Sequence, residues 1–424
     1  MREWRAAHQA LERGGGGRIG RLRSLFICQA VLTSGLSLSF PFLALYLHRE
    51  RGLGMGWVGA VLGLNVVFAS VAQALGGELS DIAGRQRVMR DSLSLRAAAV
   101  GVLAYAVWRR WPFAPLVSLL FLSTLIGNFF EPAARGWVAD HCPPSQRSRG
   151  YGLLRIAVNL GWVVGPAVGG TLAQSSYALL FAATAATCGL CSGLVAWTID
   201  NVPGERGEER FAFSGVLQAR KNPRFLRVCG LSLALGVVMA QLVVSLSIHA
   251  TQFVGLTDAQ VGWLFSLNGL IVVLIQVPAT RWWSQFPLTT ALAAGSLFYA
   301  AGYAWVGTAP TLVAMSAAIV VVTLGETTVA PALQSLWANL APPREKGRYV
   351  GFAGLVFQMG HALGPLLGGL ALQYLSPVHP SMPWLGVALV AAAAGGGFYA
   401  IGGRFSSSEQ GLDPAAAPVP EMNF

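Results

Sequence analysis

Two ionisable side chains interrupt long apolar runs of the sequence. Glu326 lies in the stretch Val-Thr-Leu-Gly-Glu-Thr-Thr, and His361 lies in a glycine-rich stretch of the next apolar run. If these runs cross a lipid bilayer, a charge at mid-depth costs roughly 3 kcal/mol, so each residue needs a functional or structural reason. Carboxyl and imidazole groups bind and release protons, an imidazole near neutral pH. Both residues are candidates for proton binding; a static hydrogen-bonded pair, or two unrelated residues lining a cavity, are the alternatives.

Further polar side chains lie in or beside such runs. Glu131 and Arg135 are four residues apart with the acid first, the favourable order for an ion pair on one helix. Arg96 and Arg155 lie one or two turns inside apolar runs, where an arginine either extends to the interface or recognises an anionic group. Amide and aromatic residues at mid-run are candidates for lining a substrate cavity: Asn65, Asn159, Trp162, Gln241, Asn268 and Gln358. A cavity rich in aromatic and amide side chains with few charges suits amphipathic or lipophilic cations better than sugars or phosphates.

The elements that position these residues are apolar segments long enough to span a membrane. The chain has 424 residues, of which 54% are hydrophobic and 11% charged, and its mean hydropathy is +0.56. A helix needs about 20 residues to cross the hydrocarbon. Twelve segments reach this length, at 24–47, 56–80, 89–108, 113–138, 149–173, 177–199, 226–252, 259–284, 288–307, 311–338, 348–373 and 382–402. We therefore predict an all-α integral membrane protein with twelve transmembrane helices.

A repeated glycine-proline pattern divides these segments into two halves. Its first copy is Gly161, Gly165, Pro166, Gly169 and Gly170, and its second copy, with the same spacing, is Gly360, Gly364, Pro365, Gly368 and Gly369. A fixed-offset duplication of apolar segments indicates two homologous six-helix bundles, with a ligand site expected between them. We predict a basic N-terminal segment at 1–23, bundles at 24–199 and 226–403 joined by a linker at 200–225, and a disordered tail at 404–424.

The basic residues, which give a net charge of +11, predict the orientation. They concentrate in 1–23, in alternate loops and in 200–225, so the positive-inside rule places both termini and the linker in the cytoplasm. We expect a monomer in the bacterial cytoplasmic membrane, with lipid around it and no nucleic-acid partner, because the charge forms no single patch. No P-loop or His-Glu-x-x-His motif occurs. We therefore expect no enzymatic activity, no metal and no cofactor, and a proton gradient as the energy source.

The loop after the second run carries the pattern G-x-x-x-D-x-x-G-R-x-R, formed by Gly77, Asp81, Gly84, Arg85 and Arg87. It resembles the signature gating loop of the major facilitator superfamily, and the resemblance covers essentially the whole chain. The resemblance implies a cytoplasmic latch between the halves. In it, Asp81 either pairs with a base or faces the positive N-terminus of a helix from the other half. The pair formed by Glu131 and Arg135 would join this latch in a charge network, or form a simple intrahelical ion pair.

The glycine-proline pattern on the fifth run is similar to the motif of antiporters in this superfamily. Its glycines open a flat face for a neighbouring helix, and Pro166 removes a helical hydrogen bond. Packing without directional meaning explains the pattern as well, since the eleventh run repeats it. Family members often have an arginine in the fourth span, four residues before a glycine. Here Ser123 precedes Gly127 at that spacing, so the resemblance transfers no proton-relay arginine to this position.

Together, these features predict a secondary active transporter that resembles twelve-helix drug:proton antiporters of the multidrug efflux type. It would export small lipophilic or amphipathic compounds by alternating access, with Glu326 and His361 coupling export to protons. A facilitator or symporter for a metabolite or lipid is the alternative. A non-transporting membrane sensor is a more remote one.

Overall fold

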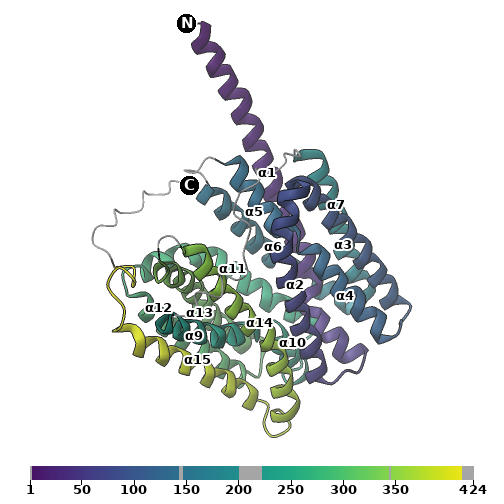
Figure 1. Cartoon of the computed structure of the whole chain (residues 1–424). Coiled ribbons are helices and arrows are strands. Elements are labelled where there is room, and N and C mark those ends of the chain that lie inside the picture. Colours follow the sequence, from purple (N-terminus) through teal and green to yellow (C-terminus); the bar gives the residue numbers. More distant parts are fainter. Residues whose placement is uncertain (1, 143–146, 200–221, 343–344, 413–424) are drawn as a thin grey trace. The chain divides into compact units, whose positions relative to one another are not determined.

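The computed structural model describes residues 2–142, 147–199, 222–342 and 345–412 (Figure 1). These ranges contain helices and turns and no strand. The helices are α1 (Arg2–Leu45), η1 (Tyr46–Glu50), α2 (Met55–Ala83), α3 (Arg85–Trp108), α4 (Phe113–Gly127), α5 (Phe130–His141), α6 (Arg147–Ser175), α7 (Tyr177–Thr198), α9 (Pro223–Ala240), α10 (Val244–Gln252), α11 (Asp258–Trp283), α12 (Leu288–Val306), α13 (Leu312–Asn339), α14 (Lys346–Leu375) and α15 (Met382–Gly402).

All twelve predicted runs are helical, but three of them contain a change of helix type or a break within the run. The first continues from α1 into the π-helix η1. The fourth divides into α4 and α5 after Asn128, whose side-chain amide donates to the Thr124 carbonyl oxygen at 2.7 Å. The seventh divides into α9 and α10 after Gln241, whose amide donates to the Val237 carbonyl oxygen at 2.9 Å. The Gln241 amide takes the carbonyl oxygen that its own backbone N–H would use in a regular helix, and that N–H donates to Val238 at 3.2 Å instead. The Thr124 oxygen accepts from both the side-chain amide and the backbone N–H of Asn128, the latter at 3.1 Å.

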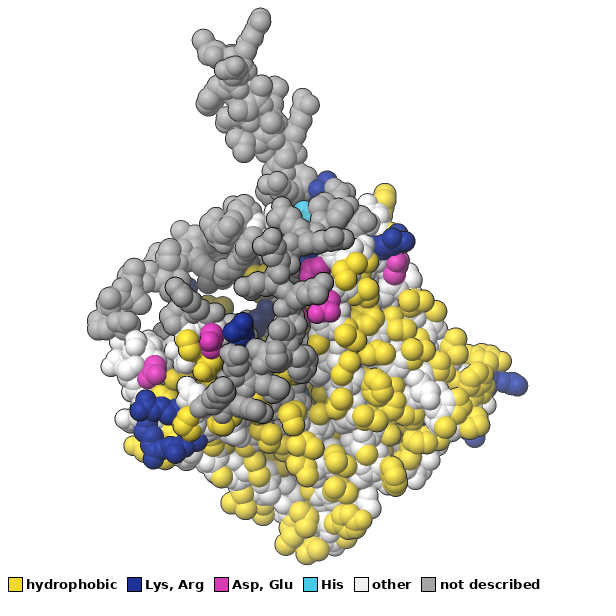
Figure 2. Space-filling model, viewed as in Figure 1, with side chains coloured by type: hydrophobic (Ala, Val, Ile, Leu, Met, Phe, Trp, Pro, Cys, Tyr) yellow, Lys and Arg dark blue, Asp and Glu magenta, His cyan; other side chains and the backbone are white. Residues whose placement is uncertain are grey.

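The surface of these helices is apolar where a soluble protein would be polar. Ten helical stretches among the described residues are long and apolar enough to cross a membrane, and α3 and α12 complete the twelve. Apolar side chains cover much of the face seen in Figure 2. Trp57, Trp197 and Leu389 expose 70%, 89% and 71% of their surface. Large apolar side chains that are this exposed, over so many helices, are stable against lipid and not against water. The chain is an integral, multi-pass membrane protein.

Close packing within the chain defines two compact units. The first contains α1 to α7, α10 and α11 as far as Val273; in it α1 lies along α6 and α7, and α3 along α7 (Figure 1). The second contains α9, α11 from Leu274 onward, and α12 to α15; in it α9 lies along α14, and α12 lies between α13 and α15. The predicted bundle at 226–403 differs from this grouping, because α10 and the first part of α11 pack with the helices of the first half.

Both copies of the glycine-proline pattern pack against the first long helix of their own half. On α6, a methyl group added at Gly161 or Gly165 would overlap Thr33, Ser34 or Ser37 of α1. On α14, the corresponding Gly360 and Gly364 approach α9, where added methyl groups would overlap Leu233 and Ala240. Small residues permit this backbone approach between membrane helices. The two equivalent contacts are the structural counterpart of the sequence repeat.

The chain after α15 is ordered further than expected. A disordered tail is predicted from 404 onward, but residues 404–412 form turns against the start of α12. Gln410 is buried, and its side-chain amide donates to the Thr289 hydroxyl oxygen at 3.0 Å and to the Gly402 carbonyl oxygen at 2.9 Å. These hydrogen bonds satisfy buried polar groups and so fix the segment. The rest of the predicted tail and residues 200–221 of the predicted linker at 200–225 lie outside the described residues.

Candidate functional site

A cavity of about 290 Å³ lies inside the first unit, near the lower end of the range for small-molecule sites. Residues of α1, α2, α3, α4, α6 and α7 line it. Its walls are mostly apolar and aromatic, with Phe40, Leu103, Leu120 and Phe181 among them. A smaller set of polar or amphipathic side chains also faces it: Thr33, Ser37, Ser39, Asn65, Arg96, Ser123, Thr124, Asn128, Trp162 and Thr184. Apolar walls with a few polar groups are typical of a small-molecule site.

Arg96 is the one charged residue of this lining, which contains no Asp or Glu. Its guanidinium lies over Gly127 of α4, where a Cβ atom would come within 2.5 Å of both Nε and Nη1. The Nε atom is buried and has no hydrogen-bond partner, and no ion pair of Arg96 occurs among the described residues. The Oδ1 atom of Asn65, also in the lining, is likewise buried without a partner. Two buried polar groups at this cavity therefore have no hydrogen-bond partner in the part of the chain that the structure describes.

The structure separates the six residues proposed from the sequence as cavity lining. Asn65 and Trp162 line the cavity of the first unit. Asn159, Asn268 and Gln358 are not among its lining residues. Gln241 lies in the second unit and donates hydrogen bonds to the carbonyl oxygens of Val237 and Gly364, at 2.9 and 2.8 Å, so it joins α9 to the glycine-proline pattern of α14.

The two proton-binding candidates lie on the consecutive helices α13 and α14 of the second unit. Glu326 of α13 is half-buried and interacts electrostatically with the phenol groups of Tyr299 and Tyr303 on α12. These two rings are fully buried and stacked, with centroids 6.0 Å apart. His361 of α14 packs on Phe357 at 5.0 Å, and its Nδ1 atom is buried with no hydrogen-bond partner among the described residues. The Glu326 carboxyl group is therefore not bonded to Nδ1 of His361.

The gating loop is a turn between α2 and α3 that brings Arg85 to three acceptors. Gly84 forms the turn with φ of 95°, a conformation that a residue with a Cβ atom rarely adopts. The Arg85 guanidinium pairs with Asp81, reaches Asp140 of α5 at 3.0 Å and donates to the Ser80 hydroxyl oxygen at 2.6 Å. Of the two alternatives for Asp81, the structure shows the pair with a base, and the base comes from the same loop.

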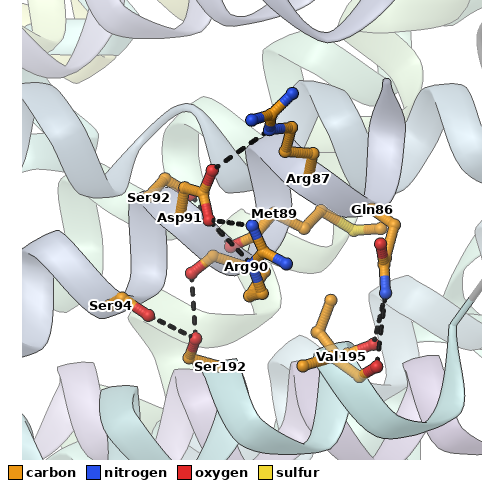
Figure 3. Close-up of polar contacts among 10 residues, drawn as sticks. Gln86, Arg87, Met89, Arg90, Asp91, Ser92, Ser94, Ser192 and Val195 are labelled. Carbon is orange, nitrogen blue, oxygen red and sulfur yellow. Dashed lines mark hydrogen bonds and ion pairs between the residues drawn. The ribbon is translucent and has the colours of Figure 1, made fainter. Parts of the chain in front are cut away.

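The start of α3 is also fixed to the end of α7 (Figure 3). Asp91 accepts from Arg90 at 2.7 Å and lies 3.8 Å from Arg87, the last residue of the gating loop. The Ser192 hydroxyl of α7 donates to the Arg90 carbonyl oxygen at 2.9 Å. Gln86 donates its amide to carbonyl oxygens of α7 at 3.3 and 3.5 Å. These contacts hold the loop on helices of its own unit.

Glu131 and Arg135 form the expected ion pair at 2.9 Å on α5. Glu131 also accepts a hydrogen bond at 3.4 Å from the amide of Gln29, which is buried on α1. The described partners of Glu131 are thus Gln29 and Arg135, whereas those of Arg85 are Asp81, Asp140 and Ser80. The two groups are separate clusters in this conformation.

A third charged cluster was not predicted from the sequence. Asp258, at the start of α11, is buried and accepts from Arg49 of η1 at 2.9 Å and from the Tyr177 hydroxyl at 3.1 Å. Gly170 of the antiporter-type pattern lies directly beside it, because a Cβ atom there would be 2.5 Å from the Asp258 carbonyl oxygen. We call Arg49, Tyr177 and Asp258 the outer cluster, because the predicted topology places them on the non-cytoplasmic side. No spacing rule links three residues so far apart in the sequence.

The first glycine-proline copy has a second neighbour besides α1. Added methyl groups at Gly262 and Gly269 of α11 would overlap backbone atoms of Pro166 and Trp162 of α6. Helix α6 is therefore packed closely against α1 on one side and α11 on another. Arg49 and Tyr177 belong to the first sequence half and Asp258 to the second, so this contact and the outer cluster both join the two halves of the sequence within the first unit.

The fold and these sites define a class of membrane transporter. A family model described as Major Facilitator Superfamily matches residues 25–253 and 235–405. The chain belongs to this superfamily, and the resemblance seen in the gating loop and the half-repeat is confirmed. Its all-α fold with twelve membrane helices in two homologous six-helix bundles follows.

Sequence relatives include multidrug resistance proteins. Multidrug resistance protein MdtH of Escherichia coli O157:H7 (strain EC4115 / EHEC) is 26% identical over 388 residues, covering 90% of this chain and 93% of the relative. The protein of the same name from Shigella boydii serotype 4 (strain Sb227) is 27% identical with the same coverage.

Solved structures of transporters share the fold. The peptide transporter POT in complex with sulfate has a TM-score of 0.75 at 16% identity, covering 92% of this chain and 96% of that one. A bacterial homologue of the human lysosomal transporter Spinster, in an inward-facing and unoccupied conformation, has a TM-score of 0.70 at 14% identity, covering 94% and 99%. At these identities the likeness shows the fold alone.

Proposed function

We propose that this transporter exports small lipophilic or amphipathic compounds in exchange for protons, by alternating access. The observation that carries the proposal is Glu326, a carboxyl group half-buried in an apolar membrane helix beside two fully buried tyrosines. The relatives named multidrug resistance proteins support export of such compounds. The apolar and aromatic walls of the first-unit cavity suit the same class of compound.

Glu326 is suited to couple protons to a conformational change. An ionised carboxylate is costly in an apolar helix, and protonation removes that cost. If the two conformations of the transporter solvate Glu326 differently, proton binding biases the equilibrium between them by its differential affinity. His361 is the second candidate, because its buried Nδ1 atom has no partner among the described residues.

Alternating access requires contacts that open and close, and the outer cluster is the candidate on the non-cytoplasmic side. It joins the ends of η1, α7 and α11 through Asp258, a buried carboxylate with two partners. The glycine contacts between α6 and α11 lie on the same helices. We propose that these contacts are closed in the conformation described here and separate when the cavity opens outward.

The test of this function uses everted membrane vesicles with an inside-acid proton gradient, followed with a pH-sensitive dye. Lipophilic cations, neutral drugs and anionic amphipathic compounds are added to wild-type protein, Glu326→Gln, Glu326→Asp and Glu78→Gln. Glu78 is exposed on α2, so Glu78→Gln is the same change at a position outside the proposed site. We expect transported compounds to collapse the gradient with wild type, with Glu326→Asp to a reduced extent, and with Glu78→Gln.

The expected result for Glu326→Gln is loss of gradient collapse with retention of substrate counterflow, because counterflow needs the conformational change and not the proton. Full gradient-driven transport by Glu326→Gln would remove Glu326 from the coupling mechanism. Counterflow by wild type that never collapses the gradient with any compound would replace proton-coupled export with facilitated transport of a metabolite or lipid.

A further inference from the structure

We infer that the cavity of the first unit binds the anionic group of an amphipathic substrate, with Arg96 as the group that binds it. This inference rests on the proposed transport function and specifies its substrate as a compound with an apolar, preferably aromatic, body and a carboxylate or similar anion. The sequence alone favours lipophilic cations for a cavity of amides and aromatics. The structure places an arginine at this cavity and no Asp or Glu in its lining.

Within the described ranges, Arg96 lacks the partners of a structural arginine. A buried guanidinium in a folded protein is normally paired with a carboxylate or with several carbonyl oxygens, since an uncompensated buried charge is strongly destabilising. Among the described residues Arg96 has no ion pair, and its Nε atom is buried without a hydrogen-bond acceptor. A guanidinium offers five N–H donors in a planar fork that matches a carboxylate.

The Arg96 side chain does not extend to the membrane surface. Its guanidinium lies directly over Gly127, inside the helices that enclose the cavity, and the absence of a side chain at Gly127 provides the room for it. An arginine that merely extended to the interface would leave its charged group in water. Arg155 provides the contrast: it is exposed on α6 and does not line the cavity.

The other polar residues of the lining include a second group that needs a hydrogen-bond partner. The Ser123 hydroxyl donates to the Leu120 carbonyl oxygen at 2.8 Å, and one N–H of the Asn128 amide donates to the Thr124 carbonyl oxygen at 2.7 Å. The Oδ1 atom of Asn65 is a buried acceptor that needs a donor. An anion at Arg96, with a hydroxyl or amide N–H elsewhere on the same compound to reach Asn65, satisfies both groups. The aromatic and aliphatic walls cover its apolar body.

The test is a binding measurement that needs no proton gradient. Three probes share one apolar body and differ in charge: 1-naphthoate, 1-naphthalenemethanol and 1-naphthylmethylammonium. Their affinities are measured by isothermal titration calorimetry on purified full-length protein in lipid nanodiscs, for wild type, Arg96→Gln, Arg96→Lys and Arg155→Gln. Elution volume and thermal unfolding of each variant report its folding.

We expect wild type and Arg155→Gln to bind 1-naphthoate most tightly of the three probes. Arg96→Gln loses about 10- to 100-fold in 1-naphthoate affinity, the amount expected for one or two hydrogen bonds to a charged group, and retains its affinity for the alcohol. Arg96→Lys keeps a preference for the anion because it keeps the charge. If Arg96→Gln fails to fold, the anion site is tested by the order of the three probe affinities on wild type and by whether Arg96→Lys keeps the preference for 1-naphthoate.

The inference is overturned if wild type binds 1-naphthoate no better than the alcohol or the ammonium, or if Arg96→Gln leaves 1-naphthoate affinity unchanged. These outcomes are separable from failure of the proposed function. Binding of 1-naphthoate through Arg96 without any proton-driven transport would leave the anion site standing and remove proton-coupled export. Proton-driven export of cations by a protein that shows no preference for 1-naphthoate would leave proton-coupled export standing and remove the anion site.

Discussion

Replacing Asp258 with asparagine tests whether the outer cluster is a contact that opens during transport. The substitution preserves the shape of the side chain and removes its charge. Asp258 is held by Arg49 at 2.9 Å and Tyr177 at 3.1 Å, and its side chain is 8% exposed. An asparagine oxygen still accepts from Tyr177, so the change acts mainly on the ion pair with Arg49.

The size of the effect follows from this geometry. A hydrogen bond to a charged group contributes about 1.5–3 kcal/mol when both partners are shielded from water. Because the Arg49 side chain is 37% exposed, solvent screening reduces the contribution toward the value of about 0.2–1 kcal/mol for surface pairs. We therefore expect Asp258→Asn to weaken the contact by about 1–2 kcal/mol. This would raise the ratio of open to closed outer ends about 5- to 30-fold.

The assay measures access to the cavity from the non-cytoplasmic side. A single cysteine is introduced by Trp162→Cys, at a position that lines the cavity and packs on Gly269, after the five native cysteines are replaced. Its rate of labelling by a membrane-impermeant maleimide, applied to spheroplasts, should rise in Asp258→Asn by the same factor. Asp91→Asn is the control, since Asp91 lies on α3 and contacts neither Arg49 nor Tyr177.

A double-mutant cycle decides whether the ion pair is the cause. If Arg49→Gln and Asp258→Asn act through one contact, the double variant should be labelled no faster than the more affected single variant. An unchanged labelling rate in both single variants would show that the outer cluster does not hold the closed conformation. Equal acceleration in Asp91→Asn would show a general loosening of the protein instead.

Two glycine substitutions give further predictions. Gly262→Ala should lower the free energy of unfolding by about 1–3 kcal/mol and reduce transport, because its methyl group overlaps the Pro166 backbone. Gly230→Ala is the control, since Gly230 has open space around it and its substitution should not lower the unfolding temperature. Equal unfolding temperatures for the two variants would contradict close packing of α6 on α11. Gly84→Ala should lower the free energy of unfolding by about 1–2 kcal/mol, because φ at Gly84 is 95°. Gly77→Ala should leave stability unchanged, because an added methyl group there meets nothing within 4 Å. Thermal unfolding in detergent measures both variants, and a lower unfolding temperature for Gly77→Ala than for Gly84→Ala would contradict the prediction.

The fold could be predicted from the sequence because its signal is local and repeated. Each apolar run reports its own helix through its length, and the glycine-proline pattern reports the two halves through its repetition. The breaks at Asn128 and Gln241 were not predicted, because each lies where one side-chain amide hydrogen-bonds to a helical carbonyl oxygen, and composition does not report such a contact. The grouping of α10 and the first part of α11 with the first unit was likewise missed, since it depends on packing between sequence-distant segments.

Whether a charged contact could be predicted also depends on how far apart its residues lie in the sequence. Glu131 and Arg135 are four residues apart on α5, so helical geometry alone predicts that pair. Asp81 and Arg85 are also four residues apart, but the turn at Gly84 lies between them, so their pair depends on the geometry of the turn. Asp140, which shares Arg85 with Asp81, comes from a helix further along the chain and has no such signal. The outer cluster joins three segments and could not be found from spacing at all.

Arg96 shows why a motif position and a chemical function need to be considered separately. In the superfamily pattern an arginine precedes the glycine of the fourth span, and here Ser123 has that place before Gly127. The structure brings the guanidinium of Arg96 from α3 over the same glycine, at a cavity that the same serine also lines. A positive charge is thus present near the expected place although the expected residue is absent. Gly127 is the link, because a side chain there would displace the guanidinium. The sequence therefore contained the signal for this site, but in the glycine of the pattern and not in its arginine position.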